Sequence, residues 1–216
     1  MTRLKYCGLT RAADAALAGE LGAAYAGAIF AGGPRAVAPA VARGVLAAAG
    51  PGVRRVGVFA GQPPAEVAAV AAEAGLDVVQ LHADPTAEAV DAVRRRYGGL
   101  VWAVLRTAGS ELPERAVALF GAADAVLLDA QVPGALGGTG HTLPWAALRG
   151  AVDRARGAGT LVLAGGLTPA NVAAAIAALA PDVVDVSSGV EHEPGVKDHS
   201  RMRAFAEAVA RAQELV

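Results

Sequence analysis

Two glycine-containing turns late in the chain have the composition of a phosphate-binding site. The first, Gly165-Gly166, follows a short apolar run and precedes a helix-forming stretch, and the second, Ser187-Ser188-Gly189, follows the next apolar run. Glycine lets the backbone approach a ligand closely, and the unpaired N–H groups at a helix start favour an anion. Each turn alone is equally consistent with an ordinary tight turn. Their occurrence in neighbouring units favours a phosphate site.

A thiol and a carboxyl group occupy comparable positions elsewhere in the chain. Cys7 ends the first apolar run and is followed by Gly8, which leaves room around the sulfur. Asp129 ends another such run and precedes a long glycine-rich stretch. A lone cysteine is most often a small buried hydrophobic residue, and an aspartate at this place often caps a loop. The two residues by themselves therefore leave open whether they react.

The elements that would position these residues alternate along the whole chain. Short β-branched runs are separated by alanine-rich amphipathic stretches, and Asp84-Pro85 and Thr168-Pro169 resemble helix starts with a capping side chain. We expect strands at 4–7, 24–30, 54–59, 78–82, 100–105, 125–129, 161–164 and 183–187, and helices at 11–21, 38–49, 64–74, 86–97, 112–121, 144–156, 169–180 and 199–213.

Eight repeated strand–helix units predict parallel strands with helical crossovers. Periodicity alone fits an open sheet as well, but eight units favour a closed (β/α)8 TIM barrel, and we expect one such domain over residues 1–216. In such barrels function belongs to the C-terminal ends of the strands, with phosphate held after strands seven and eight. The candidate residues all end or follow expected strands, which agrees with that arrangement.

Composition excludes several other classes of protein. Hydrophobic residues make up 54% of the 216 positions and charged residues 18%, which is enough for a large core and unlike a disordered chain. A net charge of −1 gives no reason to expect a nucleic-acid or anionic-membrane partner. One cysteine excludes a disulfide framework and a multi-cysteine metal site. The longest uncharged run, 157–181, is broken by glycine and proline, so we expect no membrane span and a cytoplasmic location.

Sequence blocks in order from the first expected strand to the last resemble those of the phosphoribosylanthranilate isomerase family. No single block is specific, but the ordered set is. The blocks are Lys-Tyr-Cys-Gly-Leu-Thr at 5–10, Val-Gln-Leu-His at 79–82, Leu-Leu-Asp at 127–129 with Gly-Gly-Thr-Gly at 137–140, Ala-Gly-Gly-Leu at 164–167 with Pro169, Asn171 and Val172, and Asp-Val-Ser-Ser-Gly-Val-Glu at 185–191 with Pro-Gly-Val-Lys-Asp at 194–198.

The resemblance implies an isomerase of tryptophan biosynthesis that works without a cofactor or metal. Its substrate would be N-(5-phosphoribosyl)anthranilate, converted to the ribulose form by an Amadori rearrangement. An acid must protonate the ring oxygen and a base must remove the proton from C2. The resemblance assigns the first task to Asp129 and the second to Cys7. We then expect a pKa below the free-thiol value of about 8.5 for Cys7, and above the usual value of about 3.9 for Asp129.

The resemblance also implies contacts for the rest of the substrate. Arg35 matches the arginine that pairs with the anthranilate carboxylate, a bidentate task suited to a guanidinium. The alternative is a solvated loop arginine, and the serine that usually stands two residues earlier is missing. His82 and Gly138 are candidate substrate contacts, although a structural histidine fits equally well. His141 stands where a lysine or arginine is frequent, which bears on the loop more than on the chemistry.

Strand alternation predicts a buried ion pair beneath the thiol. Lys5 shares a face with Cys7 and should point into the barrel, next to the last strand, on which Asp185 and Ser187 share a face. We therefore expect a Lys5–Asp185 pair that joins the first and last strands. We further expect this pair to bias Cys7 toward the thiolate.

Other functions compete with this interpretation. The sister aminoaldose isomerase of histidine biosynthesis, or a bifunctional relative, would have an aspartate in place of Cys7 and a second phosphate site. A non-catalytic barrel that binds a phosphorylated metabolite would not need both Cys7 and Asp129. The expected partner is a phosphorylated aminosugar, and the chain would be a monomer or a homodimer.

Overall fold

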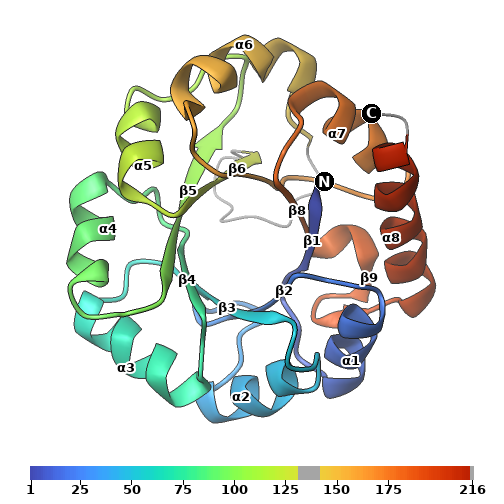
Figure 1. Ribbon diagram of the computed structural model, residues 1–216. Helices are drawn as coiled ribbons and strands as arrows, with labels where there is room; N and C mark the ends of the chain where they lie inside the picture. The colour runs from blue at the N-terminus through green and yellow to red at the C-terminus, as the bar shows by residue number, and fades with distance from the viewer. Residues whose placement is uncertain (131–141, 215–216) are drawn as a thin grey trace.

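The structure, a computed structural model, describes residues 1–130 and 142–214. Eight parallel strands follow one another in chain order around a closed barrel, and the last strand pairs with the first (Figure 1). The predicted TIM barrel is therefore confirmed. The strands are β1 (Arg3–Tyr6), β2 (Tyr25–Ile29), β3 (Arg54–Phe59), β4 (Val78–Leu81), β5 (Leu100–Thr107), β6 (Ala125–Ala130), β7 (Leu161–Leu163) and β8 (Val183–Val186).

A ring of helices surrounds the barrel, as Figure 1 shows along its axis. Each helix connects one strand to the next, except the last, which follows β8 and packs against its neighbours in the ring. The helices are α1 (Ala12–Glu20), α2 (Pro39–Ala47), α3 (Pro64–Ala74), α4 (Ala87–Arg94), α5 (Ala116–Ala122), α6 (Trp145–Arg156), α7 (Val172–Leu179) and α8 (His199–Glu214).

Three short elements were not predicted. Between β8 and α8 the chain forms a short 3-10 helix, η1 (Ser188–Val190), and then an antiparallel hairpin of β9 (Glu191–Glu193) and β10 (Val196–Lys197). The turn of the hairpin contains Gly195 at φ +85, a conformation that favours glycine. The strands of the hairpin are too short for hydrophobic alternation to reveal them.

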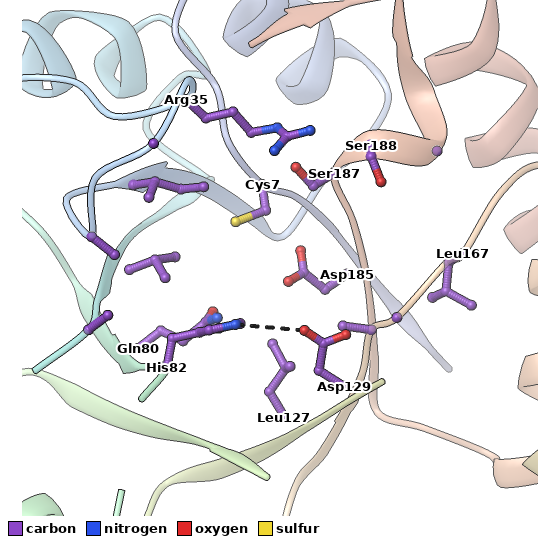
Figure 2. Close-up of a pocket in the computed structure, with 18 of the residues that line it drawn as sticks. Cys7, Arg35, Gln80, His82, Leu127, Asp129, Leu167, Asp185, Ser187 and Ser188 are labelled. Atoms are coloured by element: carbon purple, nitrogen blue, oxygen red, sulfur yellow. Dashed lines mark ion pairs between the residues drawn. The ribbon is translucent and has the colours of Figure 1, made fainter. Parts of the chain in front are cut away.

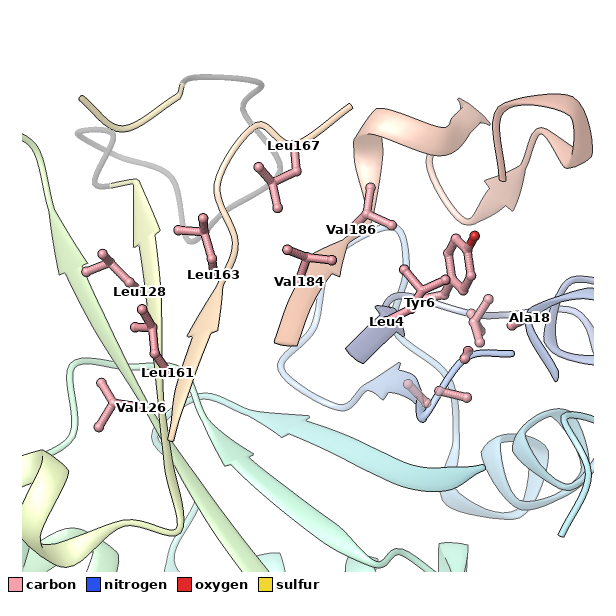
Figure 3. Close-up of a cluster of buried hydrophobic side chains, with 14 of the residues drawn as sticks. Leu4, Tyr6, Ala18, Val126, Leu128, Leu161, Leu163, Leu167, Val184 and Val186 are labelled. Carbon is pink, nitrogen blue, oxygen red and sulfur yellow. The ribbon is translucent and has the colours of Figure 1, made fainter. Parts of the chain in front are cut away.

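The core has two layers because alternate strand residues point to opposite faces. The outer layer lies between strands and helices; in Figure 3, Leu4 and Tyr6 of β1 lie near Ala18 of α1, and Val184 and Val186 of β8 belong to the same cluster. The inner layer fills the barrel, where Tyr25 and Trp102 meet edge to face with ring centroids 4.8 Å apart. Apolar packing thus closes the barrel interior and leaves polar side chains nearer the C-terminal ends of the strands.

The two proline-containing helix starts predicted from the sequence are wrong. Helix α4 begins at Ala87, where the Thr86 hydroxyl accepts a hydrogen bond from the Ala89 N–H at 3.3 Å. Asp84 instead forms ion pairs with Arg106 and Arg115, at a φ of +45. A carboxylate held by two arginines is not available to cap a helix.

The loop before α7 likewise replaces the predicted first helical turn. The helix begins at Val172, and the Asn171 side chain holds the preceding turn by accepting from the Thr168 N–H (2.8 Å) and donating to the Gly166 carbonyl (2.9 Å). Thr168 is therefore part of a fixed loop and does not cap the helix.

Candidate active site

A cavity of about 300 Å³ opens where the strands of the barrel end. In Figure 2 the labelled side chains come from several strands and loops and surround one space. Every candidate site residue in the described chain lines this cavity, whereas Gly138, like His141, lies outside the described residues. The lining includes Cys7, Arg35, Gln80, His82, Asp129, Gly165, Gly166, Asp185, Ser187, Ser188 and Gly189.

Cys7 lies directly after β1, with its N–H bonded to the Val186 carbonyl at 2.9 Å. Glycine at position 27 leaves space for the thiol, because a Cβ there would lie 3.1 Å from Sγ, whereas a Cβ on Gly8 would meet Cδ of Arg35 at 2.9 Å. Burial raises the pKa of Cys7 above its ordinary value, although Lys5 acts to lower it. The expectation of a lowered thiol pKa is therefore wrong, because loss of water around the thiolate outweighs the nearby cation.

Asp129 ends β6 and faces the same cavity (Figure 2). Its Oδ1 accepts the N–H of Ala130 at 2.8 Å, and its Oδ2 lies 3.7 Å from Nε2 of His82. Burial raises the pKa of this carboxyl, and His82 only partly offsets the shift. The direction is the one expected for a group that gives up a proton near neutral pH.

The predicted ion pair of β1 and β8 is confirmed. Nζ of Lys5 donates to Oδ2 of Asp185 at 2.8 Å and to Oε1 of Gln80 at 3.1 Å, and Lys5 is fully buried. Burial acts to lower the pKa of Lys5, but Asp185 and Cys7 outweigh it and raise the pKa overall. Lys5 therefore stays charged beneath the thiol.

Asp185 itself was not among the site residues predicted from the sequence. Its Oδ1 is buried and accepts no hydrogen bond from the described chain, and the residue lines the cavity near Cys7 and Asp129 (Figure 2). The same strand alternation that placed Ser187 in the barrel indicated this position. The carboxylate is thus available to a ligand hydroxyl.

The loops after β7 and β8 meet closely at one rim of the cavity. A Cβ on Gly189 would lie 1.9 Å from the Leu167 carbonyl oxygen, and one on Gly165 would lie 3.0 Å from Oδ1 of Asp129. Gly165 and Gly166 both have a positive φ, +84 and +63. The Gly166 N–H donates to no other described residue, so the main chain can offer it to an anion. Local packing therefore restricts positions 165 and 189 to glycine.

Arg35 reaches the cavity from the loop between β2 and α2, but its guanidinium is not free. Nε and Nη2 bond the carboxylate of Glu191 at 2.9 and 2.7 Å, and Lys197 bonds the same carboxylate at 2.8 Å. Burial acts to raise the pKa of Glu191, yet these two cations hold it below its ordinary value. Glu191 and Lys197 lie in the sequence blocks at 185–191 and 194–198 that resemble the family, but no role was predicted for either residue.

The described residues offer neither a metal cluster nor a membrane span. Among residues 1–130 and 142–214, no cluster of three histidine, cysteine or acidic side chains is arranged to hold a metal ion. In the same ranges, no helix is long and apolar enough to cross a membrane.

The fold and the cavity define a (β/α)8-barrel enzyme with its site at the C-terminal face of the strands. The family model described as N-(5'phosphoribosyl)anthranilate (PRA) isomerase matches residues 4–208. The chain therefore belongs to the N-(5'-phosphoribosyl)anthranilate isomerase family and is an isomerase of tryptophan biosynthesis.

Individual relatives agree over nearly the whole chain. The N-(5'-phosphoribosyl)anthranilate isomerase of Pseudomonas fluorescens (strain Pf0-1) is 41% identical over 96% of this chain and 98% of its own. The crystal structure of phosphoribosyl anthranilate isomerase from Thermus thermophilus has a TM-score of 0.85 and 40% identity, and the match covers 97% of this chain and 99% of that chain. A further isomerase structure, in complex with reduced 1-(o-carboxyphenylamino)-1-deoxyribulose 5-phosphate, has a TM-score of 0.84 and 34% identity, covering 98% of this chain and 100% of its own.

Proposed function

We propose that this chain isomerises N-(5-phosphoribosyl)anthranilate by proton transfer between Asp129, Cys7 and the sugar. The observation that carries the proposal is that a carboxyl of raised pKa and a thiol from different strands line one cavity, at whose rim two glycine loops meet. That arrangement fits an acid, a base and a phosphate site around one sugar.

In the first step the Asp129 carboxyl gives its proton to the ring oxygen. The bond between C1 and this oxygen breaks, the oxygen becomes the C4 hydroxyl, and the nitrogen lone pair forms a protonated imine with C1. The raised pKa of Asp129 keeps the proton available for this step.

In the second step the Cys7 thiolate removes the proton from C2. The electrons of the C2–H bond form a C1–C2 double bond, and the imine nitrogen becomes neutral, which gives an enolamine. Tautomerisation then adds a proton to C1 and removes the hydroxyl proton at C2. Return of one proton from Cys7 and one to Asp129 restores the enzyme, so the reaction consumes no cofactor.

The remaining parts of the cavity would hold the two ends of the substrate. We assign the phosphate to the main chain at Gly165, Gly166, Ser188 and Gly189, and the anthranilate carboxylate to Arg35. His82 lies 3.7 Å from Asp129 and would contact the substrate beside the acid. A cytoplasmic location and a monomeric or dimeric state remain predictions of the sequence.

The experiment is a comparison of wild-type, Cys7→Ser and Asp129→Asn proteins on N-(5-phosphoribosyl)anthranilate. Loss of a general acid or base lowers the rate by about 10²–10⁴-fold, so we expect each variant to lose kcat by that order while thermal unfolding still shows a cooperative transition. Equal rates in all three proteins would contradict the mechanism. Assay of the aminoaldose substrate of histidine biosynthesis alongside tests the alternative isomerase.

A further inference from the structure

Arg35 depends on a residue from the far end of the chain for its orientation. The loop that carries it contains Gly32 and Gly33 at positive φ, and no Cβ added at either would meet another atom within 4 Å. The Arg35 side chain is only 17% exposed, however, because its guanidinium rests on Glu191 of β9. The hairpin after β8 thus fixes a side chain that its own loop leaves unsupported.

Glu191 is itself held rigidly. Its side chain is 4% exposed and accepts hydrogen bonds from Nζ of Lys197 at 2.8 Å and from the Gly195 N–H at 3.3 Å. Lys197 is fully buried and also donates to the Ser187 carbonyl at 3.1 Å. The carboxylate is therefore fixed on two sides before it meets Arg35.

The pairing leaves one edge of the guanidinium available. Glu191 takes the Nε–Nη2 edge, with contacts of 2.9 and 2.7 Å, and Nη1 donates no hydrogen bond to any other described residue. A guanidinium has five N–H donors in a planar fork, so a second carboxylate can bind along the Nη1–Nη2 edge. With Arg35 and Lys197 positive and Glu191 negative, the group keeps one net positive charge for that carboxylate.

We propose that Glu191 is a positioning residue for Arg35, which it orients so that the Nη1–Nη2 edge meets the carboxylate of the aryl amine carried by the sugar. The inference rests on the proposed function, because it assumes that Arg35 binds that carboxylate. Glu191 touches no substrate atom itself. It determines substrate choice by fixing the direction in which the Arg35 guanidinium points.

The test compares two ligands that differ only in the carboxylate. One is the reduced product 1-(o-carboxyphenylamino)-1-deoxyribulose 5-phosphate, and the other is the same compound with a plain phenyl ring. In Glu191→Gln we expect affinity for the carboxylated ligand to fall about tenfold or more. A fall of that size corresponds to the loss of one charge-assisted hydrogen bond between Arg35 and the ligand carboxylate. Affinity for the phenyl compound should change by less than about twofold, which a merely structural role of Glu191 would not produce.

The matched control is Glu193→Gln, an exposed carboxyl on the same strand, which should leave both affinities unchanged. If Glu191→Gln does not fold, Glu191→Asp is the second variant. It keeps the charge for Lys197, but its side chain is too short to reach the Arg35 guanidinium, so it should show the same loss of affinity for the carboxylated ligand alone. In an Arg35→Ala background, Glu191→Gln should add no further loss for the carboxylated ligand.

Equal losses for both ligands, no loss for either, or additive losses in the Arg35→Ala background would overturn the inference. Failure of the proposed function is seen separately, in the wild-type protein, which would then neither isomerise N-(5-phosphoribosyl)anthranilate nor bind the reduced product.

Discussion

Burial pushes both proposed catalytic groups toward their neutral forms. For Asp129 this is useful, because an acid must keep its proton at working pH. For Cys7 it works against the thiolate, and Lys5 beneath it, with Lys197 nearby, is what opposes the shift. Burial thus favours the protonated form that the proposed acid needs and opposes the thiolate that the proposed base needs, and the buried lysine offsets part of that second effect.

The raised pKa of Asp129 predicts a pH-dependent cost to stability. The folded protein binds this proton more tightly than the unfolded chain, so stability falls as pH rises from the unfolded pKa, near 3.8, through the folded one. We expect Asp129→Asn to be more stable than wild type at neutral pH, with Tm higher by about 2–4 °C for each kcal/mol recovered. Thermal unfolding across pH measures the difference.

The gain should shrink to nothing below the unfolded pKa, where both states of the wild type are protonated. Asp91→Asn, an exposed carboxyl on α4, is the control and should change stability by less than about 0.5 kcal/mol at every pH. If Asp129→Asn is no more stable than wild type at neutral pH, the buried carboxyl does not lower the stability of the folded protein.

At the scale of elements, the loops after β7 and β8 explain why glycine occupies the rim that is proposed to hold the phosphate. Glycines there are typical of anion sites. At position 189, however, glycine is also the only residue type that fits against the Leu167 carbonyl, and glycine at position 165 leaves space for Asp129. The rim therefore forms because two loops can touch, and the hairpin of β9 and β10 that follows supports Arg35 on the neighbouring side.

Gly189→Ala tests whether contact between these loops matters for phosphate. The new Cβ would lie 1.9 Å from a backbone oxygen, so the loops must separate, at a cost to stability of about 1–3 kcal/mol. We expect inorganic phosphate to inhibit this variant more weakly than wild type, measured as the inhibition constant. Gly44→Ala in α2, where a Cβ meets nothing within 4 Å, is the control and should leave phosphate inhibition unchanged. Unchanged inhibition in Gly189→Ala would leave packing as the only role of this glycine.

At the scale of the whole molecule, a buried ion pair closes the barrel. Strands β1 and β8 come from opposite ends of the chain and pair in the register Lys5↔Asp185, and the side chains of these two residues join across the interior. Gln80 of β4 bonds the same ammonium group at 3.1 Å. The pair thus links three strands and holds Asp185 at the bottom of the cavity.

Removing one partner of this ion pair should lower the free energy of unfolding more than removing both charges. Lys5→Met leaves the buried Asp185 carboxylate without its partner, and we expect the free energy of unfolding to fall by about 3–5 kcal/mol. The double variant Lys5→Met with Asp185→Asn leaves no unpaired charge and should recover part of the loss. Chemical denaturation of wild type and both variants measures this. A double variant less stable than Lys5→Met alone would show that the pair is not the cause.

Local patterns predicted much of the fold and of the site. Alternation of β-branched and alanine-rich runs placed all eight strands to within one or two residues, since each such strand is buried on both faces. Strand alternation also predicted that Lys5 meets Asp185, because parallel register fixes which faces adjoin. The placement of Cys7, Arg35, His82 and Asp129 around one cavity followed from their strand ends.

The sequence by itself therefore determined the eight strand–helix units and the strand ends at which the candidate groups gather, since hydrophobic period and strand direction are local properties. Only the tertiary structure decided that Glu191 holds Arg35, that Asp84 binds two arginines instead of capping α4, and that burial raises the pKa of Cys7. Ion pairing and desolvation depend on which distant residues surround a group, and no local pattern encodes those neighbours.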